Sequence, residues 1–126
     1  VIDSDVDDKY FFSQKAVDGM MRNRESMNKG RAQNVDEPCN TVGAHLAKVS
    51  LNSTDPVLKV DNKYRRFTPR EVARIQSFPE TFKLTESEHA QYKALGNAIP
   101  PVMFWYIMRS VKDSLNSEKK YESITV

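Results

Sequence analysis

The sequence predicts a small α+β fold in which short strands come first and helices follow. Residues 41–46 and 57–60 are rich in strand-favouring side chains and lie between clusters of turn residues. From Thr68 onward, capping residues, prolines and apolar residues at helical spacing mark three successive helices. The order of these two patterns separates a strand-containing first half from a helical second half.

The composition limits how large a core this chain can bury by itself. Its 126 residues are 39% hydrophobic and 29% charged, which is polar for a globular domain. The formal net charge of +2 does not indicate a nucleic-acid-binding protein, so a basic surface has to come from local clustering. The single cysteine excludes an internal disulfide and fits a reducing cytosol. We expect no membrane association, and we expect a chain that does not begin with Met to be a fragment of a longer protein.

The sequence specifies a helix start at Thr68. This residue can accept a hydrogen bond from a free amide of the first turn, and Pro69 occupies the first helical position. Glu71 lies three residues after the cap and can reach back to the amide of Thr68. The helix is expected to run to about Ser77, because the approach of Pro79 disfavours helical backbone before it.

Two arginines of this helix are candidates for binding an anion. Arg70 and Arg74 are four residues apart, so their guanidinium groups share one face and both could grip a single anion. The same spacing occurs on ordinary solvated helix surfaces, where Arg70 could bridge to Glu71 or to another acid. Spacing alone favours the solvated surface.

The first residues predict an acidic lead-in followed by a helix. Residues 1–10 contain four aspartates, but the glycine and glutamate that complete a calcium-binding loop are missing, so we reject a calcium site. Ser13 is a candidate N-cap for a helix that runs to about Arg24. Met20 and Met21 are expected to fill the core side of this helix.

Residues 27–33 form a basic loop for which two interpretations remain open. Lys29 and Arg31 lie close in sequence to Arg22 and Arg24, with few acids nearby. The loop is either solvated and flexible or in contact with DNA phosphates, which supply most of the affinity in such interfaces.

Residues 36–47 combine a turn and a predicted strand. The Asp-Glu-Pro sequence at 36–38 is typical of a turn, and 41–46 predicts a strand. Gly43 within it could permit close approach of another backbone. Residues 57–60 predict a second short strand, and 61–63 turn the chain toward Thr68.

The last third of the chain predicts two helices. Residues 87–95 form the first, with Gly96 as a left-handed residue that ends it. The last helix is expected over about 102–115, followed by a polar tail that frays. Its first two turns are apolar all round, and so small a chain has too little mass to bury them. We therefore expect the chain to be incomplete.

Residues 65–82 and 92–103 resemble motifs IX and X of the DNA (cytosine-5)-methyltransferases. The sequence LGNAIPP at 95–101 is similar to motif X. Two long motifs in the right order and at the right distance form a specific signal. The residues that fit motif IX are Arg66, Phe67, Thr68, Arg70, Glu71, Ala73, Arg74, Ile75, Gln76, Phe78 and Pro79.

A weaker resemblance extends into residues 34–60. Asp36, Pro38, Thr41 and Val42 fit an element of the family's target recognition domain. Pro38 and Cys39 also resemble the catalytic Pro-Cys pair of these enzymes, but Asn follows where the family has Gln, and the pair lies shortly before motif IX. We therefore reject Cys39 as the nucleophile and expect a small, partly buried side chain.

The resemblance implies that the chain is the C-terminal portion of an S-adenosylmethionine-dependent methyltransferase. It implies part of the target recognition region at 1–63, motif IX and the following helix at 64–95, a motif X helix at 96–116 and a tail at 117–126. The α/β catalytic domain would be absent, because the cofactor's Gly-rich motif, the Pro-Cys-Gln loop and the Glu-Asn-Val motif are not found among these residues. The motif X helix would pack on that missing domain.

The resemblance also implies a reaction and a set of site residues. Such enzymes flip a cytosine out of duplex DNA, attack carbon 6 with a cysteine thiolate and methylate carbon 5. Asn97 and Ile99 would contact the cofactor, S-adenosylmethionine, and Arg66, Arg70 and Arg74 would contact double-stranded DNA, together with the loop residues Lys29 and Arg31. The complete protein would be a cytoplasmic bacterial enzyme of a restriction-modification system, whereas the chain alone would be inactive.

Other interpretations remain open from the sequence. The chain could be a non-catalytic DNA-binding module, the small subunit of a split methylase, or an interaction protein that docks through its last helix. The unburied helix also predicts self-association of the isolated chain. An upstream reading frame that carries the missing motifs would distinguish these cases.

Overall fold

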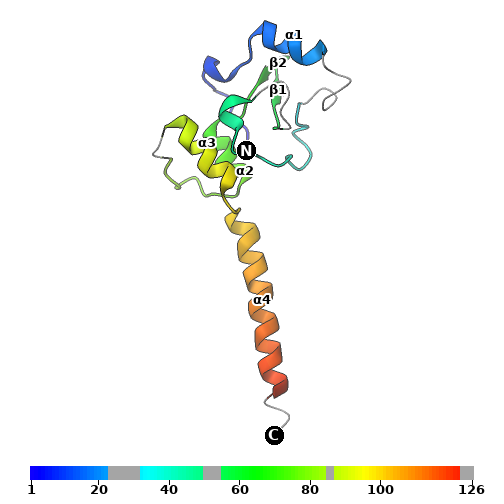
Figure 1. Cartoon of the computed structure of the whole chain (residues 1–126), viewed down its shortest axis with the longest axis vertical. Coiled ribbons are helices and arrows are strands. Elements are labelled where there is room, and N and C mark those ends of the chain that lie inside the picture. Colours follow the sequence, from blue (N-terminus) through cyan, green and yellow to red (C-terminus); the bar gives the residue numbers. More distant parts are fainter. Residues whose placement is uncertain (23–31, 50–54, 85–86, 123–126) are drawn as a thin grey trace.

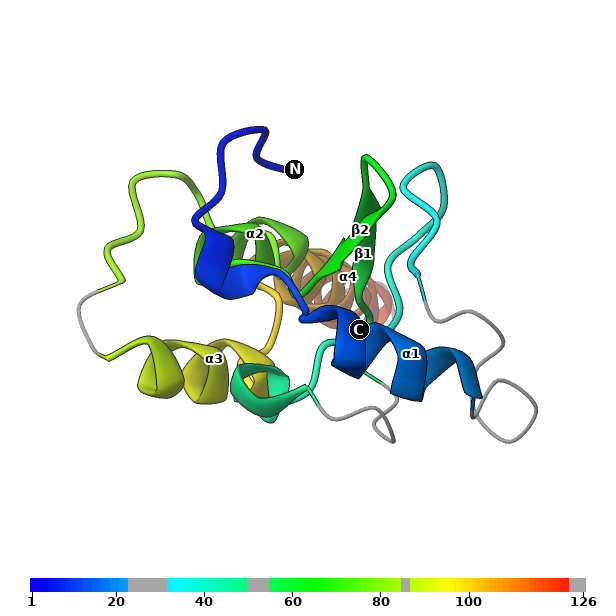
Figure 2. The same ribbon diagram turned by 90° about the horizontal axis from the view of Figure 1, so that it is seen from above.

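The computed structural model describes residues 1–22, 32–49, 55–84 and 87–122. Within these residues the structure combines two antiparallel strands with helices, which confirms the α+β class (Figure 1). Figure 2 shows that α1, the strands, α2 and α3 lie together and form one body. The elements in chain order are the 3-10 helix η1 (Asp8–Tyr10), α1 (Gln14–Arg22), the 3-10 helix η2 (Leu46–Lys48), β1 (Leu58–Val60), β2 (Lys63–Arg65), α2 (Pro69–Ile75), α3 (Glu88–Asn97) and α4 (Pro101–Glu122).

Strands β1 and β2 form a tight hairpin that leads directly into α2. Leu58 lies opposite Arg65 in the antiparallel register. Asp61 and Asn62 connect the strands with φ values of 47° and 63°, the left-handed conformation that two-residue hairpin turns require. The predicted strand at 57–60 is confirmed over β1. The sequence analysis missed β2, because a charged three-residue segment carries no clear alternation of apolar side chains.

Helix α2 begins with the capping box that the sequence predicts. The Glu71 N–H donates to Thr68 Oγ1 at 3.2 Å, and the Thr68 N–H donates to Glu71 Oε2 at 2.7 Å. The helix ends at Ile75, two residues before the predicted end. Ser77 then adopts a left-handed backbone with φ 62°, which turns the chain away from the helix axis.

Helix α1 begins after Ser13 as predicted and ends at Arg22. The Ala16 N–H donates to Ser13 Oγ at 3.4 Å. Val17 packs against the buried Val57 and Tyr64 of the hairpin region. Met21 is 37% exposed, so its predicted place in the core was wrong.

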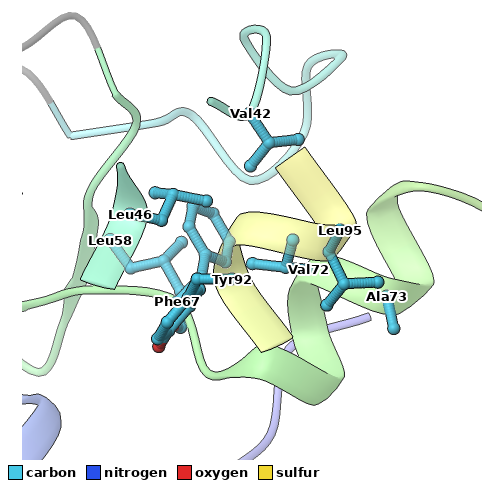
Figure 3. Packing of buried hydrophobic residues seen from close by; sticks show 8 residues of the cluster. All are labelled: Val42, Leu46, Leu58, Phe67, Val72, Ala73, Tyr92 and Leu95. Atoms are coloured by element: carbon cyan, nitrogen blue, oxygen red, sulfur yellow. The ribbon is translucent and has the colours of Figure 1, made fainter. Parts of the chain in front are cut away.

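The apolar core lies between η2, the hairpin, α2 and α3 (Figure 3). The Tyr92 hydroxyl donates to the Phe67 carbonyl oxygen at 2.5 Å, which satisfies the phenol inside the core. This bond also ties α3 to the residue that precedes the cap of α2. The buried members of the core are Val42, Leu46, Leu58, Phe67, Val72, Ala73, Tyr92 and Leu95.

Residues 41–46 do not form the predicted strand. The chain turns there and enters η2, and both Val42 and Leu46 are buried in the core. These two side chains are four residues apart and point to the same side (Figure 3). A spacing of four places two side chains on one face of a strand as well as of a helical turn, so the sequence pattern could not distinguish the two.

The close backbone approach expected at Gly43 occurs, and its partner is Gly96. A Cβ atom on Gly96 would lie 2.4 Å from the backbone nitrogen of Ala44 and 2.4 Å from the carbonyl carbon of Gly43. Gly96 belongs to α3, so its predicted role as a left-handed residue beyond the helix was wrong. Its missing side chain instead lets α3 pack directly on the segment before η2.

Helix α4 projects from the body, with its far end distant from every other described element (Figure 1). The side chains from Val102 to Met108 are between 47% and 62% exposed, all round the axis. The helix ends at Glu122 and not near Leu115, so most of the predicted fraying tail is helical. In the part of the chain that the structure describes, no helix combines the length and the apolar character that a membrane crossing needs.

Candidate functional site

A buried ion pair between β2 and α2 organises the region that carries the candidate arginines. Arg65 Nη1 donates to Glu71 Oε2 at 2.8 Å, and Nη2 donates to Glu71 Oε1 at 2.7 Å. The two side chains are 1% and 0% exposed. Glu71 also accepts hydrogen bonds from the backbone N–H groups of Thr68 and of Asp3, the latter at 2.8 Å. A buried pair of this kind is tolerated because its remaining polar atoms find partners.

The electrostatics of Glu71 result from two opposed effects. Burial by itself raises the pKa of the carboxyl group. The hydrogen bonds from Arg65, Thr68 and Asp3 outweigh burial, so the pKa of Glu71 lies below its usual value. The carboxylate is therefore ionised at neutral pH and joins the strand, the helix cap and the N-terminal segment.

Arg74 fastens the N-terminal segment to the outer side of α2. Its Nη1 donates to Asp3 Oδ1 at 2.6 Å and to the Val1 carbonyl oxygen at 3.1 Å. Its Nε and Nη2 donate to the carboxylate of Glu80. The hydrogen bond from Arg74 holds the pKa of the exposed Glu80 below its usual value. Arg74 is thus engaged by two acids, and an incoming phosphate would have to displace one of them.

Arg70 is less fully engaged than Arg74. Its Nη2 donates to the Phe82 carbonyl oxygen at 2.8 Å. Its Nη1 is buried and has no hydrogen-bond partner among the described residues. The two arginines therefore bind different partners in this structure and are not brought together on one anion. Arg70 keeps a donor for a further acceptor, and a buried donor without an acceptor costs stability.

Arg66 ties the N-terminal segment to α3. Its Nη1 donates to the Ala47 carbonyl oxygen at 2.8 Å, and its Nη2 donates to Glu88 Oε1 at 2.8 Å. The guanidinium carbon lies 5.2 Å from the ring centre of Tyr10, whose hydroxyl donates to Glu88 Oε2 at 2.9 Å. Both Nη atoms are thus engaged within the chain, so a DNA contact through either of them would need these bonds to be exchanged. The buried Nε of Arg66 has no partner among the described residues.

Most of the predicted basic loop at 27–33 falls outside the part of the chain that the structure describes. Lys29 and Arg31 lie outside the described residues. Their assignment as DNA contacts stays a prediction from the sequence.

The candidate cofactor residues lie at the end of α3 and on the short linker that joins it to α4. Asn97 is the last residue of α3 and is exposed, and Ile99 is 62% exposed. Ala98 between them is extended, with φ −74° and ψ 147°. The linker thus presents an amide and an apolar side chain where the body meets α4 (Figure 1).

Cys39 has the surroundings of a structural cysteine. Its side chain is half-buried beside a cavity of about 290 Å³. Burial raises the pKa of the thiol, so it stays protonated at neutral pH. A nucleophilic cysteine needs the opposite shift. The cavity is also lined by Val35, Leu58, Phe67 and Ile75.

A second cavity lies between α3 and the loop that follows α2. It has a volume of about 260 Å³ and a largely apolar lining. Its lining includes Phe78, Phe82, Leu84, Ala94 and Ala98. Among the described residues, no group of three or more His, Cys, Asp or Glu side chains is placed to hold a metal ion.

Comparison with known proteins shows the class to which this fold and site belong. The sequence profile of the C-5 cytosine-specific DNA methylase family matches residues 4–113. The chain therefore belongs to this family.

Individual relatives are type II methyltransferases. Over 95% of its length, the chain is 34% identical to the type II methyltransferase M1.ScrFI of Lactococcus lactis subsp. cremoris. Over 67% of its length, it is 38% identical to M.AplI of Arthrospira platensis, and over 60% it is 42% identical to M.Bpa9945I of Bacillus paralicheniformis. The matched parts amount to only 32%, 24% and 16% of these relatives, so the chain spans a third of their length or less.

The sequence analysis missed two charged partners at the centre of the site, namely Arg65 as the partner of Glu71 and Asp3 as the partner of Arg74. The double arginine at 65–66 provided no means of telling a buried arginine from an exposed one. The capping-box glutamate was a usable signal, because Glu71 at the third helical position already has to turn back toward the segment before the helix. The pairing of Asp3 with Arg74 joins residues far apart in the chain, and local patterns carry no information about it.

Proposed function

We propose that the chain is part of a DNA (cytosine-5)-methyltransferase of a restriction-modification system. The complete protein transfers a methyl group from S-adenosylmethionine to carbon 5 of a cytosine in a specific duplex DNA sequence. The observation that carries this proposal is the family match over residues 4–113. The identity to M1.ScrFI along almost the whole chain supports it.

Within such an enzyme, the chain supplies DNA recognition and part of the cofactor site. The resemblance to motif IX falls on β2 and α2, and the resemblance to motif X falls on the end of α3 and the start of α4. This order supports placing the chain at the C-terminal end of the enzyme, with residues 1–63 in the target recognition region. The cysteine nucleophile would then come from the catalytic domain, and Cys39 would take no part.

On the DNA side, Arg70 is the best placed of the candidate arginines. Its buried Nη1 has no partner among the described residues, so a small shift of the surrounding side chains would let it donate to a phosphate oxygen while Nη2 keeps its bond to Phe82. Arg74 would act mainly by orienting the segment around Asp3. Arg66 would orient α3 through Glu88.

On the cofactor side, the linker fits a ligand that has both polar and apolar faces. The exposed amide of Asn97 can donate and accept hydrogen bonds, and the exposed Ile99 can pack against a planar ring. S-adenosylmethionine supplies the methyl group when it is bound. The residues of this chain would bind and orient it and would take no part in bond making.

Helix α4 supports the proposal that a catalytic domain is the partner of this chain. A second helix would cover one stripe of α4, whereas Val102, Phe104 and Ile107 expose apolar surface in several directions. Only a concave surface of a larger body covers all of them. Further along, Phe104, Met108, Val111 and Leu115 follow each other at spacings of four, three and four, so one stripe continues toward the end of the helix.

Methyl incorporation by the complete protein tests the proposed function. The protein that contains this chain is incubated with S-adenosylmethionine labelled with tritium in its methyl group and with mixed duplex DNA. We expect acid-stable label in the DNA that is recovered as 5-methylcytosine after nucleoside digestion. Label on adenine, or no label with any duplex, would contradict the proposal.

A split methylase is the second candidate function. The unpartnered helix α4 favours it over a free-standing DNA-binding module, because docking on a separate catalytic subunit would cover the same surface. A continuous reading frame that encodes the missing motifs upstream identifies a single-chain enzyme, and a neighbouring gene that encodes them identifies the split form. If both are absent, the chain is a non-catalytic module.

A further inference from the structure

Two adjacent residues at the end of α2 hold both ends of the linker between α3 and α4. Gln76 Nε2 donates to the Leu95 carbonyl oxygen, in the last turn of α3, at 2.8 Å. The Val102 N–H, in the first turn of α4, donates to Ser77 Oγ at 3.1 Å. The linker residues 98–100 lie between these two points of attachment.

The end of α2 is itself fixed by its backbone. The Gln76 N–H donates to the Val72 carbonyl oxygen at 2.9 Å, and the Ser77 N–H donates to the Arg74 carbonyl oxygen at 2.9 Å. Gln76 is only 8% exposed, so its amide reaches Leu95 through the interior. The left-handed backbone of Ser77 turns its hydroxyl group toward α4.

The two attachments act on helix ends that need partners. The last carbonyl groups of α3 and the first N–H groups of α4 have no partner inside their own helices. The Leu95 carbonyl oxygen also accepts the Ala98 N–H at 3.2 Å, which bends the chain out of α3. At α4, side chains are exposed from Pro101 to Ser117, so the bond to Ser77 lies where little packing holds the helix.

We propose that Gln76 and Ser77 are positioning residues for cofactor binding. They fix the segment 97–99 relative to α2, so that Asn97 and Ile99 are held in the orientation that the cofactor needs. This inference rests on the proposed function, since it takes these two residues as cofactor contacts. It adds that the DNA-facing helix α2 sets their position, and that neither Gln76 nor Ser77 needs to touch the cofactor.

The consequence is a selective loss of cofactor affinity. Without the Gln76 amide, the linker gains freedom that has to be lost again on binding, while the DNA-facing side of α2 keeps its contacts. A single buried hydrogen bond is worth enough to weaken S-adenosylmethionine binding roughly three- to tenfold. The KM for duplex DNA should not change.

The test uses the complete protein and three substitutions. Gln76→Met keeps the length of the side chain and removes the donor. Ser77→Gly removes the hydroxyl group and suits the left-handed backbone, so it folds even if the Gln76 variant does not. Ser77→Asn restores an acceptor at a position where Asn tolerates positive φ, and it should recover wild-type behaviour. Gln14→Met on α1 is the matched control, since among the described residues that amide donates to the exposed Asp18 of its own helix.

Two readouts are measured on each protein. Steady-state kinetics give the KM for S-adenosylmethionine and the KM for DNA separately. Hydrogen exchange followed by mass spectrometry reports the amides of residues 97–102. We expect a raised KM for S-adenosylmethionine alone, together with faster exchange of this segment, in Gln76→Met and Ser77→Gly but not in Gln14→Met or Ser77→Asn.

The outcomes separate this inference from the proposed function. If the wild-type protein transfers methyl groups and both variants keep its KM for S-adenosylmethionine, the inference is overturned and the proposed function stands. An equal rise of both KM values would also overturn it, because it would indicate general misfolding. If the wild-type protein transfers no methyl group, the proposed function fails, and unchanged exchange of residues 97–102 would then overturn the positioning role as well.

Discussion

Arg65 and Glu71 lie six residues apart and meet through two parallel hydrogen bonds of 2.8 and 2.7 Å in the interior of the chain. The pair joins the end of the hairpin to the first turn of α2. It therefore fixes the helix that carries the candidate DNA-contacting arginines. Because the pair is buried, removal of either partner would leave a charge in the interior without compensation.

Breaking this pair should strongly destabilise the protein. Glu71→Gln and Arg65→Met each leave an uncompensated polar group in the interior, and the expected loss is about 3–5 kcal/mol of unfolding free energy. Urea unfolding followed by circular dichroism measures it. Glu80→Gln breaks an exposed contact and serves as the control, with an expected effect within about 1 kcal/mol. Equal effects of the buried and exposed substitutions would contradict the role given to the pair.

The pH dependence of stability should carry the signature of Glu71. Its pKa in the folded protein lies below the usual value of 4.5, so the unfolded chain takes up the proton first as the pH falls. The stabilisation is therefore complete above about pH 4.5 and is lost as the pH falls through the folded pKa. Urea midpoints between pH 7 and pH 3 should fall more steeply for the wild-type protein than for Glu71→Gln. If the midpoints of both proteins fall in parallel with pH, Glu71 is not the source of the pH-dependent stability.

Substitution of the α2 arginines should weaken DNA binding by the complete enzyme. For Arg70 we expect the loss of a direct contact with a DNA phosphate. A charge-assisted hydrogen bond to phosphate is worth about 1.5–3 kcal/mol, so Arg70→Ala should cost about tenfold or more in affinity. Arg74→Ala should act through the Asp3 segment and also lower stability. Fluorescence anisotropy with duplex DNA measures the first effect and urea unfolding the second. Unchanged affinity and turnover in both variants would show that the two arginines are ordinary surface residues without a role in DNA binding.

The chain by itself should show no methyl transfer. The burial that raises the pKa of Cys39 leaves a protonated thiol, and no residue of the chain is proposed as the nucleophile. Incubation of the isolated chain with tritiated S-adenosylmethionine and mixed duplex DNA should leave the DNA unlabelled. Incorporation that disappears in Cys39→Ser would reverse the rejection of this cysteine.

The isolated chain should hide helix α4 by self-association. Its first turns expose a large apolar surface, and burial at about 25 cal/mol per Å² makes association favourable before its entropic cost is subtracted. Trp105 is the only tryptophan, so its emission reports this helix alone. Sedimentation should show a dimer or a larger species with blue-shifted emission, and Trp105→Glu should restore the monomer. A wild-type monomer at tens of micromolar with the emission of free indole would disprove this.

Local chemistry determined the parts of this protein that the sequence predicted well. The capping box of α2, the strand β1, the start of α1 and the apolar character of α4 each depend on residues close together in the chain. The resemblance of residues 65–82 and 92–103 likewise pointed to the family, which the match over residues 4–113 shows. In these cases the interaction partners lie within a few residues of one another.

Tertiary structure decided what the charged and glycine residues do. Arg74 binds Asp3, Arg66 binds Glu88, and Arg65, with no special mark in the sequence, became the buried partner of Glu71. Position 96 has to be glycine because the backbone of Gly43 and Ala44 leaves no room for a Cβ atom. These residues are distant in the chain, so no local pattern predicts the contact. An arginine has the same local propensities whether it faces water, a carboxylate or a phosphate, because the choice depends on which distant acid the folded chain brings within reach.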